Sequence, residues 1–97
     1  MAATFVVLLN YTEQGIKNFK DMPARAKAAE ESFSKVGGKL LSYHLTLGQY
    51  DAVVIAEFPD DAAAAKSMIA QAALGNVKTT TLRAFTREEA EGIARSL

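Results

Sequence analysis

Residues 40–58 read LLSYHLTLGQYDAVVIAEF, and this stretch decides the fold. Two runs of strand-forming residues flank Gly48-Gln49, and glycine is favoured at the first position of a two-residue type II′ turn. The stretch therefore predicts a β-hairpin that joins strands 40–47 and 50–58. The register set by this turn pairs Leu47 with Tyr50, Leu45 with Ala52, Tyr43 with Val54 and Leu41 with Ala56.

The two faces of this hairpin differ in polarity. Side chains alternate between faces along a strand, so the four predicted pairs share one apolar face. The other face carries Leu40, Ser42, His44, Thr46, Asp51, Val53, Ile55 and Glu57. On it, Asp51 lies opposite Thr46 and diagonally from His44, which predicts a polar patch near the turn.

The segments before the hairpin predict a strand and an interrupted helix. Residues 5–9, FVVLL, are branched and apolar, as in a strand that is buried on both faces. Thr12 is placed to cap a helix whose apolar residues recur every three or four positions up to residue 36. Pro23 interrupts that period, so we expect a kink or two helical pieces, with Asp21 as a second N-cap. Gly37-Gly38 ends the helix.

The segments after the hairpin predict a helix, a strand and a short terminal helix. Asp60 or Asp61 caps an alanine-rich helix over residues 62–74, and residues 77–85 form the fourth strand. The spacing of Thr86 and Glu89 is that of a capping box. We expect the terminal helix to dock on the domain through Ile93 and Leu97.

The resulting order, βαββαβ plus a C-terminal helix, predicts an α+β, ferredoxin-like fold with a four-stranded antiparallel sheet, in one domain spanning residues 1–97. In this fold the first and third strands are central, and both are apolar on their two faces here. Two helices cover only one face of such a sheet. The other face therefore predicts a second copy of the chain, in a homodimer or a multiple of dimers.

Composition excludes several classes of protein. The chain has 97 residues, with 11 Lys+Arg against 11 Asp+Glu and no cysteine. Zero net charge without a basic run argues against nucleic acid as a partner. The lack of cysteine excludes disulfides and thiol catalysis, and one histidine without a second ligand predicts no metal site and no cofactor. No apolar stretch approaches the roughly 20 residues of a membrane span, so we expect a cytoplasmic protein without a membrane partner.

At Gly48-Gln49-Tyr50-Asp51 the chain resembles the GYD-domain family of small bacterial and archaeal proteins. The similarity continues in YTEQGI at 11–16, GGK at 37–39, YHLTL at 43–47, PDD at 59–61 and LGNVKTTTLRAFT at 74–86. The resemblance implies a ferredoxin-like fold of the dimeric α/β-barrel type, in which two sheets pack face to face. It implies neither an established activity nor agreed catalytic residues.

Three interpretations of the GYD turn stay open. In the first, Gly48 serves the turn conformation, Tyr50 packs on Leu47, and Asp51 accepts backbone hydrogen bonds. In the second, His44, Thr46 and Asp51 bind a small organic ligand in a cavity on the sheet face. In the third, His44 and Asp51 form a general base in a cofactor-independent oxygenase, isomerase or decarboxylase. A purely structural or regulatory assembly module is the remaining hypothesis for the whole chain.

Overall fold

The computed structural model describes residues 2–97 and confirms the predicted order of elements. The N-terminal half contains strand β1 (Ala3–Tyr11), helix α1 (Glu13–Lys17), a 3₁₀ turn η1 (Phe19–Asp21) and helix α2 (Met22–Ser34). The remainder contains strands β2 (Lys39–Leu45) and β3 (Ala52–Phe58), helix α3 (Asp61–Ala73), strand β4 (Val77–Ala84) and helix α4 (Arg87–Arg95).

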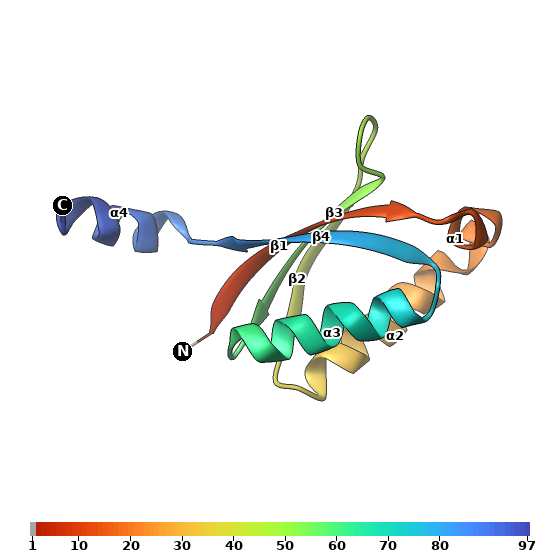
Figure 1. Cartoon of the computed structure of the whole chain (residues 1–97), viewed down its shortest axis with the longest axis horizontal. Coiled ribbons are helices and arrows are strands. Elements are labelled where there is room, and N and C mark those ends of the chain that lie inside the picture. Colours follow the sequence, from red (N-terminus) through yellow and green to blue (C-terminus); the bar gives the residue numbers. More distant parts are fainter. Residues whose placement is uncertain (1) are drawn as a thin grey trace.

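The four strands form one antiparallel sheet in the order β2-β3-β1-β4, so β1 and β3 are central as predicted. Helices α2 and α3 lie side by side on one face of this sheet, and no helix of residues 2–97 lies over the opposite face (Figure 1). This is the α+β, ferredoxin-like fold that the sequence predicts. The sheet therefore has a helix-covered face and an open face.

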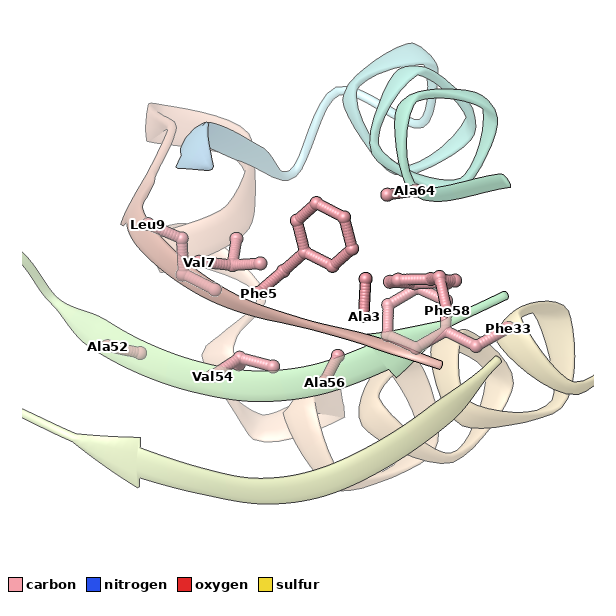
Figure 2. Close-up of a cluster of buried hydrophobic side chains, with 10 residues drawn as sticks. All are labelled: Ala3, Phe5, Val7, Leu9, Phe33, Ala52, Val54, Ala56, Phe58 and Ala64. Atoms are coloured by element: carbon pink, nitrogen blue, oxygen red, sulfur yellow. The ribbon is translucent and has the colours of Figure 1, made fainter. Parts of the chain in front are cut away.

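The hydrophobic core lies between the sheet and the two helices. Alternate residues of β1 and β3 point to this side, where they meet Phe33 of α2 and Ala64 of α3 (Figure 2). Phe58 is fully buried, and its ring lies edge-on to Phe33 and Phe5, with centroids 5.2 Å and 5.9 Å away. The period of two along both central strands thus places half of their apolar side chains in the core.

The first helical region consists of separate pieces, which confirms one of the two expected outcomes at Pro23. Thr12 caps α1, because its hydroxyl accepts from the Gly15 N–H at 3.1 Å. The chain then passes through η1, and Pro23 stands in the first turn of α2, where its missing N–H costs no hydrogen bond. Asp21 occupies the N-cap position without a side-chain cap. Ile16, in α1 before the break, is 55% exposed and is not part of the core.

The hairpin turn is longer than predicted, and the pairing of Leu47 with Tyr50 is wrong. The ladder ends at Leu45–Ala52, and beyond it the Thr46 N–H donates to the Asp51 carbonyl at 2.9 Å. Leu47 is fully exposed, so Tyr50 does not pack on it. Residues 50 and 51 form other hydrogen bonds instead. The Thr46 hydroxyl donates to the Tyr50 carbonyl at 2.6 Å, and the Asp51 N–H donates to the Leu9 carbonyl of β1 at 2.9 Å.

A β-bulge at Leu41 shifts the pairing of β2 with β3 by one residue at the end of the hairpin away from the turn. The predicted pairs Leu45–Ala52 and Tyr43–Val54 are present, but Ala56 faces Leu40 instead of Leu41. The extra residue shifts Leu40 onto the helix-covered face, where it packs against the core. Leu41 is left 45% exposed.

Helix α4 does not dock on the domain, contrary to the sequence prediction. Its predicted capping box is present, with the Glu89 N–H donating to the Thr86 hydroxyl and the Thr86 N–H donating to the Glu89 carboxylate. The helix nevertheless projects away from the sheet beyond the end of β4 (Figure 1). Ile93 is 48% exposed and Leu97 fully exposed. Within residues 2–97, no helix has the length and apolarity that crossing a membrane requires.

Candidate functional site

The polar residues predicted near the turn lie at the end of the hairpin, and two of them have backbone partners. The Asp51 carboxylate accepts from the Tyr11 N–H at 2.9 Å, and the Asp51 N–H donates to the Leu9 carbonyl at 2.9 Å. The Thr46 hydroxyl is the group that binds Tyr50. These bonds hold the GYD segment against the end of β1, as the structural interpretation of the turn expects.

His44 stands opposite Val53 on the open face, and its side chain is exposed. Thr46 and Asp51 lie beyond the last ladder pair, Leu45–Ala52, so a common face for all three residues stays a prediction. The backbone brings Thr46 and Asp51 together. No hydrogen bond joins His44 to either of them in the part of the chain that the structure describes.

The open face of the sheet carries a continuous apolar patch, which we call the open-face patch. It consists of Val6, Leu8, Val53, Ile55 and Leu82. The ladders pair Leu8 with Val53, and Val6 with both Ile55 and Leu82, so the five side chains are direct neighbours across three strands. None of the five reaches the burial of the core residues, and Leu82 is 47% exposed.

A cleft of about 440 Å³ opens on the other side of the sheet, between α2, α3 and the strands. Small residues make room for it, because α2 contributes Ala26 and Ala29 and α3 contributes Ala70. Met22, Phe33 and Met68 supply much of its apolar wall. This volume falls within the range of small-molecule sites in proteins.

Two tyrosines are among the polar residues that line this cleft. The hydroxyls of Tyr11 on β1 and Tyr43 on β2 are 2.6 Å apart and share one hydrogen bond. Burial above all, and then the bond with Tyr43, raise the pKa of Tyr11 far above its usual value, whereas the charge of Arg25 acts in the opposite direction. Tyr11 therefore stays protonated at neutral pH and can serve as a hydrogen-bond donor.

Arg25 supplies a positive charge at the edge of the cleft. Its guanidinium donates to the Asn18 carbonyl at 2.8 Å and to the Gly15 carbonyl at 3.1 Å, which fixes the side chain beside α1. Among residues 2–97, no ion pair involves Arg25 and no carboxylate lines the cleft. Both of its partners are neutral carbonyl oxygens, so neither balances the positive charge of the guanidinium.

Sequence reasoning missed the cleft residues, although two signals pointed to them. Tyr11 continues the alternation of Val7 and Leu9, and Tyr43 lies on the predicted apolar face, so both were in phase with the core. Arg25 follows Met22 by three positions and therefore borders the apolar face of α2. The separation of the two helices is a tertiary property with no sequence signal of its own.

The described residues contain no cluster of three or more His, Asp or Glu side chains with metal-binding geometry. The described residues offer apolar contact on the open-face patch, and phenol and guanidinium groups at the cleft.

Comparison with known proteins places these features in a family. The family model described as the GYD domain matches residues 5–94. The chain is also 34% identical over 83 residues to the "Glutamine synthetase and cystathionine beta-lyase binding protein" of Thermus thermophilus. This match covers 84% of the chain and 87% of the relative. The chain therefore belongs to the GYD domain family.

Proposed function

We propose that this protein is a protein-binding assembly module that associates with a second copy of itself through the open-face patch. The single observation that carries the proposal is the apolar surface of the two central strands on the side without helices. Burial of apolar surface stabilises a protein by roughly 25 cal/mol per Å², and the exposed patch does not contribute this free energy in a single copy of the chain. A domain of ordinary stability, about 5–15 kcal/mol, gains substantially when a second sheet covers such a face.

The size of the open face fits this role. Four strands spaced about 4.8 Å apart and about 27 Å long span a projected area of roughly 500 Å². The accessible surface of such a corrugated face is larger than its projection, and a standard interface takes about 800 Å² from each partner. By projection alone, the open face therefore supplies more than half of the area that each partner contributes to a standard interface.

The relative supports a role in binding other proteins. Its printed name describes a protein that binds glutamine synthetase and cystathionine β-lyase. We propose the same class of partner for this chain, in the cytoplasm, with these two enzymes as the first to test. Helix α4 is the second available surface, because Ile93 and Leu97 are exposed on an element that stands away from the domain.

The self-association proposal is tested by analytical ultracentrifugation across micromolar concentrations. The wild-type chain should sediment as a dimer or a multiple of dimers, and Leu8→Lys should sediment as a folded monomer, because it places a charge in the centre of the patch. Lys27→Gln, on the exposed side of α2, is the control and should keep the wild-type mass. A wild-type chain that stays monomeric at all concentrations contradicts the proposal.

The partner proposal is tested separately by surface plasmon resonance with immobilised glutamine synthetase or cystathionine β-lyase from the same organism. We expect saturable binding of the wild-type chain. Ile93→Asp should weaken it if α4 makes the contact, whereas Leu8→Lys should weaken it if only the assembled form binds. Failure of both enzymes to bind would remove them as partners and would leave the self-association result standing.

A second candidate is a small organic ligand at His44, Thr46 and Asp51. The observation that favours it is the exposed imidazole of His44, which has no hydrogen-bond partner among residues 2–97 and stands opposite Val53 of the patch. We prefer binding to catalysis by His44 and Asp51, since the Asp51 carboxylate already accepts a bond from β1. Native mass spectrometry of the purified chain should show a retained ligand that His44→Ala removes while the assembly stays intact.

A further inference from the structure

We infer that the cleft between α2, α3 and the sheet is a binding site for a small organic carboxylate with an apolar body. The site is independent of the open-face patch, because it lies on the other face of the sheet. Three observations support it: an apolar volume, an uncompensated positive charge, and a pair of phenol hydroxyls with a spare proton.

The apolar volume accounts for the body of the ligand. The cleft measures about 440 Å³, and its walls contain Met22 and Phe33 of α2 and Met68 of α3. Methionine and phenylalanine side chains pack well against aromatic rings, and flexible methionines adapt to different shapes. The alanines of the facing helices leave this space unfilled, whereas larger residues would close it.

The hydrogen-bond inventory accounts for the polar end of the ligand. Two phenols carry two protons, and the Tyr11–Tyr43 bond uses one of them. Within the described residues, neither hydroxyl has another partner, so the second proton is available to an acceptor. The ligand therefore presents at least one acceptor oxygen to the tyrosine pair.

The positive charge of Arg25 favours an anion as the acceptor. Arg25 lines the cleft, its charge acts on Tyr11, and its own partners are two neutral carbonyls. No Asp or Glu of residues 2–97 lines the cleft, and Asp51, outside it, acts on Tyr11 in the opposite direction but less strongly than Arg25. A carboxylate between the phenol pair and the guanidinium would receive charge-assisted hydrogen bonds, which are about twice as strong as neutral ones.

Isothermal titration calorimetry with 2-naphthoate and its neutral analogue 2-naphthamide tests the inference. The two probes share an apolar body and differ in charge. We expect naphthoate to bind at least about tenfold more tightly, a difference of about 1.4 kcal/mol. Equal affinities, or no binding of naphthoate at millimolar concentration, would overturn the inference.

Four variants locate the probe. Arg25→Gln should reduce the preference for naphthoate over naphthamide to less than about threefold, whereas Lys27→Gln, which removes the same charge two residues away on α2, should retain it. Arg25→Lys keeps the charge and should preserve part of the preference even if the bonds to α1 are lost. Ala29→Phe should fill the cleft and abolish binding of both probes.

A fifth variant, Leu8→Lys, distinguishes the cleft from the open-face patch. It should leave the affinity for naphthoate unchanged, because Leu8 lies on the other side of the sheet. Loss of binding in Leu8→Lys with full binding in Ala29→Phe would place the probe on the patch and contradict the inference. Circular dichroism of each variant establishes that it is folded before the comparison is made.

Discussion

At the scale of single residues, Ser67 is the side chain whose environment fits it least. It lies on α3 and is 3% exposed, and within residues 2–97 its hydroxyl has no hydrogen-bond partner. A buried hydroxyl without a partner lowers stability, and alanine is also the better helix former. We expect Ser67→Ala to raise the free energy of unfolding by about 1 kcal/mol in urea denaturation. Ser34→Ala, at an exposed serine of α2, is the control and should change it by less than about 0.5 kcal/mol.

Gly48 is the residue of the GYD segment whose backbone conformation restricts its replacement. Its φ of +110° is disfavoured for any residue with a Cβ, although nothing within 4 Å would collide with one. Gly48→Val should therefore lower stability by about 1–3 kcal/mol through backbone strain alone. Gln49→Ala, one residue further, should have little effect. Thermal melts of equal midpoint would show that the loop adopts another conformation.

At the scale of elements, the two N-caps of α3 and α4 offer a matched comparison. Asp60 accepts from the Ala63 N–H at 2.8 Å, and Thr86 accepts from the Glu89 N–H at 3.1 Å. Loss of either cap should cost about 1 kcal/mol locally. Asp60→Ala should lower the global melting temperature because α3 packs on the sheet, whereas Thr86→Ala should only speed amide exchange in α4. An equal fall in melting temperature would mean that α4 is packed against another chain.

At the scale of the whole molecule, the alkaline limit of stability should reflect Tyr11. Its pKa is raised in the folded chain, chiefly by burial, so above about pH 10 the unfolded chain has lost a proton that the folded chain still binds. The free energy of unfolding should therefore be unaffected by this group below pH 10 and fall as pH rises beyond it. Urea denaturation at pH 9 to 11 measures the slope. Tyr11→Phe should reduce the slope, and an identical slope in both chains would contradict the assignment.

The sequence by itself determined the elements, their order and the pairing of the central strands. Local signals were sufficient there: the apolar runs of β1 and β3, the caps at Thr12 and Thr86, and Pro23 at the start of the second helical piece. These signals act over a few residues, and burial of both central strands allows few alternative sheet orders. The same patterns also identified the open face as apolar, since period-two alternation assigns every side chain to a face.

Only the tertiary structure decided the turn, the bulge, the cleft and the position of α4. The loop after Thr46 is held by a hydrogen bond between Asp51 and Tyr11 of β1. These two residues are 40 positions apart in the sequence, so no local pattern predicts the bond. The hydroxyls of Tyr11 and Tyr43 meet although β3 lies between their strands in the sheet, and α2 brings Arg25 to the same cleft. Helix α4 has the pattern of a docking helix, but a pattern specifies an apolar face and not the surface that covers it. Contacts between distant segments depend on how the elements pack, and that packing is settled by the whole chain at once.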